Sequence, residues 1–196
     1  MSLEELTSSA IELLKSLIAT PSFSEEEDQT AELIDAWLKK YGVITQREGN
    51  SVIAVNKHED PSKPYFLLNS HHDTVRPNKA YTRDPFAPEV IDGKLYGLGS
   101  NDAGGPLVSL MATFVHFYNR SDLPYNLMIV ASVEEETAGN NSLRGILPLL
   151  PEFELAIVGE PTLLDLAIAE KGLLVYDAIV KALPHMRHIL TMIIRS

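Results

Sequence analysis

The chain has 196 residues, is 45% hydrophobic and carries 16 basic against 27 acidic side chains, a formal net charge of −11. This size and composition fit one globular domain. The acidic balance argues against nucleic-acid binding, because neutralising phosphates requires clustered Lys and Arg. The absence of cysteine excludes disulfides and thiolate zinc sites. The acidic N-terminal segment does not resemble a signal peptide, and no apolar run reaches membrane-spanning length, so we expect a cytoplasmic protein without membrane partners.

The N-terminal end is predicted to form two helices. Apolar residues recur at helical spacing between Ile11 and Ile18, and the following "TPS" ends this first helix. Ser24, followed by three glutamates, is predicted to cap the second helix, because acidic side chains stabilise the positive N-terminal end of a helix. The second helix is expected to run to about Lys40 and to end at Gly42.

The rest of the chain alternates between strand and helix patterns. Two β-branched stretches, "GVITQ" and "SVIAVNK", are predicted to be strands joined by a turn. Three apolar runs, "PYFLLNS", "NLMIVASV" and "ELAIV", are typical of buried strands, with helix patterns in "GPLVSLMATFVHFYN" and "NSLRGILPLL". The stretch 76–105 is expected to be mostly loop, and 166–181 a β-hairpin. This alternation predicts an α/β fold with a sheet covered on both faces.

Four polar clusters lie at or near the carboxyl ends of the predicted strands, where such folds bind their ligands: "HHD", "SNDAGG", "EEE" and "GEP". Each one alone has an ordinary interpretation, because "HHD" and "GEP" can be polar turns, Asp102 can cap a helix and "EEE" can be a solvated loop. Together they favour a shared cleft, since gathered carboxylates repel one another unless cations neutralise them. Carboxylates and imidazoles are the ligands of hydrolytic zinc, manganese or cobalt sites.

The motifs "SHHDTV", "YGLGSNDAGG", "VEEET" and "VGEPT", in this order and spacing, resemble metallopeptidase family M20. The resemblance extends from the N-terminal helices to about Lys181. It implies a zinc-peptidase-like three-layer α/β/α catalytic domain around a mixed, largely parallel sheet. Residues 1–172 would be the N-terminal part of that domain, left incomplete. Residues 173–196 would begin a second, dimerisation domain that is otherwise missing.

The resemblance also implies a centre of two metal ions, zinc above all, with cobalt or manganese as alternatives. His71 and Glu160 match ligands of the first ion, Glu136 matches a ligand of the second, and Asp102 matches the carboxylate that bridges both. In the family a cis peptide bond usually follows the bridging aspartate, which would place it between Asp102 and Ala103.

Two further residues match catalytic positions of the family. Asp73 matches the aspartate that orients the metal-binding histidine, and Glu135 matches the general base. The chain departs from the usual pattern at Glu134, where the family has Asp, and at Gly104, where it has Lys. Neither departure replaces a ligand.

The resemblance implies a metal-dependent amidohydrolase that removes an acyl group from an N-acyl amino acid. "LLNSHHDTVRPN", "DPFAP" and "GLGSNDAGGP" are most similar to the acetylornithine deacetylases of arginine biosynthesis. A succinyl-diaminopimelate desuccinylase or a dipeptidase of the same family is the alternative. A second hypothesis, from a different class of function, is that the chain is a non-catalytic remnant. A measurement of bound metal would distinguish the two hypotheses.

The closing stretch "KALPHMRHILTMIIRS" departs from the family pattern after "YDAIV". With one choice of codons, a frame that starts at the third base of the Lys181 codon reads "GTPSHAAHPNDDNP", which resembles the family segment with a second-domain histidine. We therefore interpret residues from about 182 onward as out of frame, and His185 and His188 as accidental. We expect little activity from this chain and, for an intact relative, a homodimer. A genuine amphipathic tail is the alternative.

Overall fold

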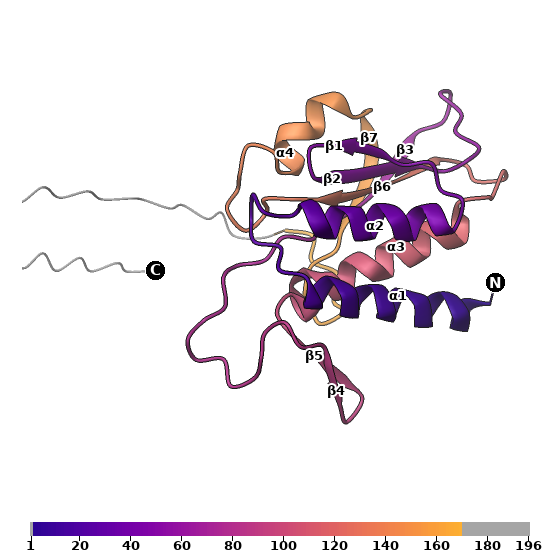
Figure 1. The fold of residues 1–196 in the computed structure, drawn as a ribbon. Coiled ribbons are helices and arrows are strands. Elements are labelled where there is room, and N and C mark those ends of the chain that lie inside the picture. Colours follow the sequence, from indigo (N-terminus) through magenta and orange to yellow (C-terminus); the bar gives the residue numbers. More distant parts are fainter. Residues whose placement is uncertain (1, 170–196) are drawn as a thin grey trace, which may run out of the picture. The chain divides into compact units, whose positions relative to one another are not determined.

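The computed structural model describes residues 2–169, and the chain up to Leu164 forms one compact unit (Figure 1). The predicted domain boundary at 172/173, most of the expected hairpin and the out-of-frame segment lie outside the described residues. The helices are α1 (Leu3–Ala19), α2 (Asp28–Lys40), the irregular helical turn η1 (Ser100–Gly104), α3 (Gly105–Phe117), α4 (Leu143–Ile146) and the short turn η2 (Leu147–Leu149). The strands are β1 (Gln46–Glu48), β2 (Ser51–Val55), β3 (Tyr65–His71), β4 (Glu89–Ile91), β5 (Lys94–Tyr96), β6 (Asn126–Ser132) and β7 (Phe153–Val158).

The central sheet is mixed, with the strand order β1-β2-β6-β3-β7. The pairs β1–β2 and β2–β6 are antiparallel, whereas β3 runs parallel to both β6 and β7. His71 pairs with Ser132 and Asn69 pairs with Val158, so the carboxyl ends of β3, β6 and β7 meet at one edge of the sheet. This confirms the α/β prediction and brings three of the polar clusters together.

Two hydrophobic clusters lie on opposite faces of the sheet. The larger one packs α1, α2 and α3 against one face, and the smaller one packs Ile146 of α4 against Leu67 and Val130 on the other (Figure 1). Every residue of β6 is buried, as its continuous apolar run predicts. Within the described residues, no helix combines the length and apolar character needed to cross a membrane.

Four local predictions differ from the structure. Ser24 does not cap α2, which begins four residues later behind Glu27 and without a side-chain cap, because the Ser24 hydroxyl is hydrogen-bonded elsewhere. "GVITQ" is not a strand except at Gln46, and the expected loop 76–105 contains the short β4–β5 hairpin. β7 is largely exposed, with Leu155 54% accessible, because it is the edge strand of the sheet among the described residues.

The packing of α2 against the sheet can be tested with a matched pair of isoleucines. Ile34 on α2 is completely buried, whereas Ile44 is 77% exposed. Ile34→Ala should reduce the free energy of unfolding by about 2–5 kcal/mol, because it removes buried methyl groups and leaves a cavity. Ile44→Ala should change it by no more than about 0.5 kcal/mol. Urea denaturation of both variants measures the difference, and equal losses would contradict this packing.

Candidate metal centre

His71, the last residue of β3, lies at the centre of the candidate site and is almost completely buried. Its Nδ1 lies 3.0 Å from the backbone oxygen of Asp73 and 3.3 Å from the Oδ1 atom of the Asp73 carboxylate. Its Nε2 faces three other carboxylates, at 3.2 Å from Asp102, 3.8 Å from Glu135 and 3.9 Å from Glu160. One ring nitrogen is therefore held by the protein, and the other is directed toward a cluster of acids.

Asp102 reaches the cluster from η1, the turn that precedes α3. Its backbone is not helical, with φ −118° and ψ 99°, and the Asp102–Ala103 peptide bond is cis, as the family resemblance implies. The side chain is 58% exposed and its Oδ1 points at the imidazole of His71. Asp102 therefore presents a carboxylate to both the buried histidine and solvent.

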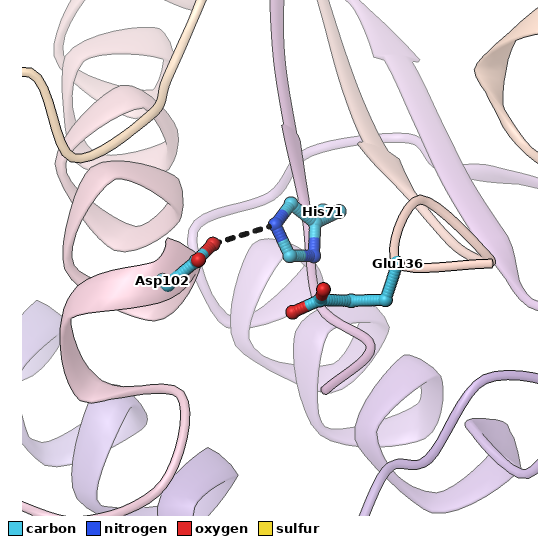
Figure 2. A group of neighbouring side chains, drawn as sticks. All are labelled: His71, Asp102 and Glu136. Atoms are coloured by element: carbon cyan, nitrogen blue, oxygen red, sulfur yellow. Dashed lines mark hydrogen bonds and ion pairs between the residues drawn. The ribbon is translucent and has the colours of Figure 1, made fainter. Parts of the chain in front are cut away.

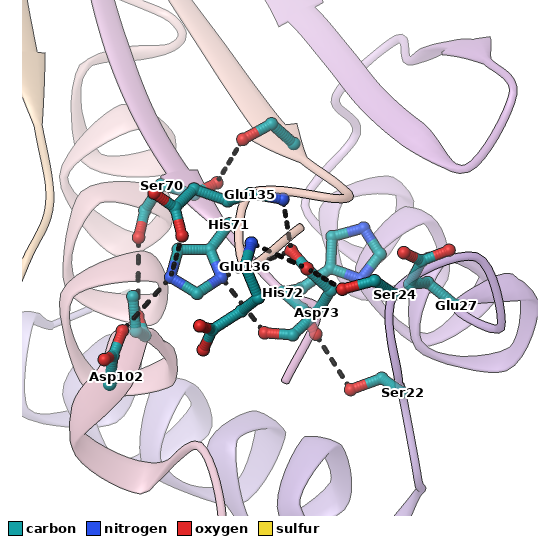
Figure 3. Close-up of polar contacts among 12 residues, drawn as sticks. Ser22, Ser24, Glu27, Ser70, His71, His72, Asp73, Asp102, Glu135 and Glu136 are labelled. Atoms are coloured by element: carbon teal, nitrogen blue, oxygen red, sulfur yellow. Dashed lines mark hydrogen bonds and ion pairs between the residues drawn. The ribbon is translucent and has the colours of Figure 1, made fainter. Parts of the chain in front are cut away.

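Glu135 and Glu136 follow β6 on a turn that is hydrogen-bonded to Asp73. The backbone N–H groups of Glu135 and Glu136 donate to the two carboxylate oxygens of Asp73, at 3.1 and 3.2 Å (Figure 3). The Glu135 side chain is 55% exposed and lies beside His71. The turn thus fixes two neighbouring carboxylates in different positions around one imidazole.

Glu134, the first residue of "EEE", is buried and connects this turn to the loop that follows it. It is only 4% exposed, and its carboxylate accepts hydrogen bonds from the backbone and side-chain nitrogens of Asn141. A Cβ atom at Gly139 would lie 2.7 Å from the Cβ atom of Glu134, so a larger residue there would force the loop or Glu134 to shift. The sequence presents Glu134 only as a departure from the family pattern, and nothing in "EEE" indicates that its first residue is the buried one.

Three of the predicted ligands form a group that could hold a metal ion. One ligand atom from each of His71, Asp102 and Glu136 lies within 4.8 Å of the others (Figure 2). Ligand atoms of a tetrahedral zinc ion lie roughly 3.4 Å apart, given zinc–ligand bonds of about 2.1 Å. The three ligand atoms would therefore have to move only slightly closer together to bind an ion. Glu160 completes the set, with its Oε2 atom 3.9 Å from the same Nε2 atom of His71. A site with one imidazole and three carboxylates suits zinc, manganese or cobalt. Which ion each residue binds stays a prediction.

The electrostatics of the cluster favour a cation. Burial and neighbouring acids raise the pKa values of Glu136 and Glu160 above the ordinary value. Burial alone would lower the pKa of His71, but the carboxylates of Asp73, Glu160 and Glu135 raise it to about 9. The protein without metal therefore keeps a positive imidazolium among these acids, in a place where a bound cation would neutralise them.

The model of peptidase family M20/M25/M40 matches residues 67–178, and the chain belongs to this family. This confirms the family that the four motifs predict. The chain is 35% identical to acetylornithine deacetylase from Yersinia pseudotuberculosis serotype O:1b (strain IP 31758), over 83% of this chain and 46% of that protein. It is 30% identical to succinyl-diaminopimelate desuccinylase 2 from Ruegeria sp. (strain TM1040), over 78% of this chain and 41% of that protein. The chain thus spans somewhat less than half the length of these relatives.

Solved structures share the fold. An M20 family metallo-carboxypeptidase from Sulfolobus solfataricus superposes with a TM-score of 0.62 at 23% identity, over 81% of this chain and 37% of that one. A Bacillus subtilis protein described as a dinuclear metal-binding peptidase of family M20 gives a TM-score of 0.60 at 18% identity, over 79% of this chain and 43% of that one. The described α/β unit therefore has the fold of part of an M20 peptidase.

The neighbouring histidine, His72, generates a pH prediction. Its Nε2 lies 3.2 Å from the carbonyl oxygen of Asn50 and its Nδ1 lies 3.0 Å from the Thr30 hydroxyl, which fits a neutral ring that donates from Nε2. Burial lowers the pKa of His72 to about 4, from an ordinary value of 6.5. Below pH 6.5, His72 becomes protonated in the unfolded chain but stays neutral in the folded protein. The free energy of unfolding therefore decreases as the pH falls from 6.5 toward 4.

The size of this effect is up to about 3 kcal/mol, since one pKa unit corresponds to about 1.4 kcal/mol. His72→Gln should flatten the dependence of unfolding free energy on pH between 6.5 and 4, measured on metal-free protein by urea denaturation. His58 is exposed, and His58→Gln should keep the slope of the parent chain. A His72→Gln variant with an unchanged slope would show that His72 is protonated in the folded protein.

Proposed function

We propose that this chain carries the metal centre of a hydrolase that removes the acyl group of an N-acyl amino acid, with N-acetylornithine as the substrate. The observation that carries the proposal is the position of His71 Nε2, which lies within 4 Å of carboxylate oxygens from three separate chain segments. A buried imidazole held by Asp73 on one nitrogen and facing acids with the other is the arrangement of a metal ligand supported by a carboxylate.

Four side chains would hold two divalent ions, zinc first. His71 and Glu160 would hold the first ion, Glu136 would hold the second, and Asp102 would be shared by both. The donor set fits, because ligand atoms of His71, Asp102 and Glu136 lie within 4.8 Å of one another and the Glu160 carboxylate lies 3.9 Å from His71 Nε2, and imidazoles and carboxylates are the ligands of such ions. The ions would supply a water of lowered pKa and would polarise the carbonyl of a bound substrate.

Glu135 would transfer the proton. Its side chain lies beside the imidazole, and more than half of its surface is open to solvent, so that it can reach a water and a substrate at the centre. Its carboxylate accepts a proton from the attacking water and then donates it to the leaving amine nitrogen as the amide C–N bond breaks. The products are the carboxylate of the acyl group and the free amine.

The choice of substrate rests on the relatives. The 35% identity with an acetylornithine deacetylase supports N-acetylornithine and a place in arginine biosynthesis, and the 30% identity with a desuccinylase supports succinyl-diaminopimelate as the second candidate. A longer polypeptide of this family, assayed on N-acetylornithine, succinyl-diaminopimelate and dipeptides, distinguishes these substrates. The chain matches 46% of the length of the deacetylase, so the tests on this chain measure metal binding rather than turnover. If the chain binds no metal, it would be a non-catalytic remnant.

Asp102→Asn tests the bridging role. The amide is a weaker ligand without charge, so the variant should lose both metal ions, as measured by elemental analysis after purification without chelator. Asp92 is an exposed aspartate on the β4–β5 turn, and Asp92→Asn should leave metal content unchanged. Equal metal content in the parent chain and in Asp102→Asn would contradict the assignment of Asp102.

The two neighbouring glutamates should behave differently. In this chain Glu135→Gln should keep metal content nearly intact, whereas Glu136→Gln should weaken metal binding, both followed by titration with Zn²⁺. In a full-length relative the substitution that corresponds to Glu135→Gln should reduce turnover by about 100- to 10,000-fold, because it removes the proton carrier. The reverse pattern, with metal lost only from Glu135→Gln, would mean that our assignment of the two residues is shifted by one.

A further inference from the structure

Residues 22–27, the segment between α1 and α2, run alongside the strand end that carries the candidate centre. Phe23 forms an isolated parallel bridge with Thr74, and the backbone N–H of Thr74 donates to the carbonyl of Ser22 at 2.8 Å. The Ser22 hydroxyl donates to the carbonyl of His72 at 2.9 Å. Backbone and side-chain hydrogen bonds therefore connect the 22–27 segment to residues 72–74.

Within this segment, Ser24 contacts the residue on which the site depends. Its hydroxyl donates to Asp73 Oδ2 at 2.7 Å, while the same carboxylate accepts from the backbone N–H groups of Glu135 and Glu136 (Figure 3). The other carboxylate oxygen of Asp73 also faces His71 Nδ1 at 3.3 Å. Asp73 is completely buried, and a carboxylate has about four acceptor positions, so these partners saturate it.

The segment is itself held in place. The backbone N–H of Glu25 donates to the Glu27 carboxylate at 2.8 Å, and Glu25 has a left-handed backbone with φ 75°. Glu27 is 1% exposed and also accepts from Asn50 at 3.4 Å. Because this local structure sets the path of residues 24–27, the Ser24 hydroxyl is presented to Asp73 from a fixed position.

We propose that Ser24 is a positioning residue of the metal centre, whose hydroxyl keeps the Asp73 carboxylate oriented toward His71 and the turn of Glu135 and Glu136. The role rests on the proposed function, because it concerns the same metal ions. Without the hydroxyl, Asp73 keeps its other donors, but its carboxylate can rotate and move the imidazole and the turn together. Ser24 thus acts on the metal through Asp73 and does not touch it.

Titration with Co²⁺, followed by the visible absorption of the bound ion, tests this role. Ser24→Ala should weaken Co²⁺ binding about tenfold and alter the spectrum, in the range seen when groups supporting a metal ligand are removed. Ser24→Thr keeps the hydroxyl and should bind Co²⁺ within about twofold of the parent chain. Unfolding free energies of the metal-free proteins, measured alongside, report any general loss of stability.

Ser22→Ala is the matched control. It removes a hydroxyl from the same segment, but that hydroxyl binds the His72 carbonyl and not Asp73. It should lower stability and leave Co²⁺ affinity and the Co²⁺ spectrum unchanged. Equal weakening by Ser22→Ala and Ser24→Ala, or failure of Ser24→Thr to restore binding, would overturn the positioning role while leaving the proposed function intact. A parent chain that binds no Co²⁺ would overturn the proposed function, and the positioning role with it.

Discussion

The buried carboxylate of Asp73 is the constraint on which the site depends. A fully buried charge is costly unless hydrogen bonds and charged partners satisfy it, and Asp73 finds them in His71, Ser24 and the backbone N–H groups of Glu135 and Glu136. Burial alone would raise the pKa of Asp73, but these donors hold it below the ordinary value, so the group stays charged. Satisfying one carboxylate therefore fixes an imidazole, the turn of Glu135 and Glu136, and the 22–27 segment at once.

The sheet explains why the sequence could predict most of the site. Parallel strands bring their carboxyl ends to the same edge, and the clusters "HHD", "EEE" and "GEP" lie at or just after the ends of β3, β6 and β7 respectively. Continuous apolar runs predicted β3 and β6 because those strands are covered on both faces by the two hydrophobic clusters. Side-chain spacing, the order of the motifs and the family resemblance were thus enough to name the residues that gather around His71.

The remaining features depend on contacts that no local pattern contains. Ser24 and Asp73 are 49 residues apart, and a serine before three glutamates has the same sequence signature whether it caps a helix or binds a distant carboxylate. Glu134 is buried and accepts a hydrogen bond from the backbone N–H of Asn141, seven residues further along the chain. β7 has the apolar sequence of a buried strand, but it is largely exposed at an edge of the sheet among the described residues.

Burial divides the candidate centre into interior residues that set its geometry and carboxylates that face solvent. His71 and Asp73 lie in the interior, where close packing and hydrogen bonds limit their movement, whereas the side chains of Asp102 and Glu135 are 58% and 55% exposed. Exposed carboxylates on a free surface would not keep one arrangement, because their mutual repulsion and rotamer freedom oppose it. Here each exposed group begins at a fixed backbone, Asp102 at the turn before α3 and Glu135 at the turn bound to Asp73. The same residues can therefore remain open to water while their oxygens stay directed at the Nε2 atom of His71.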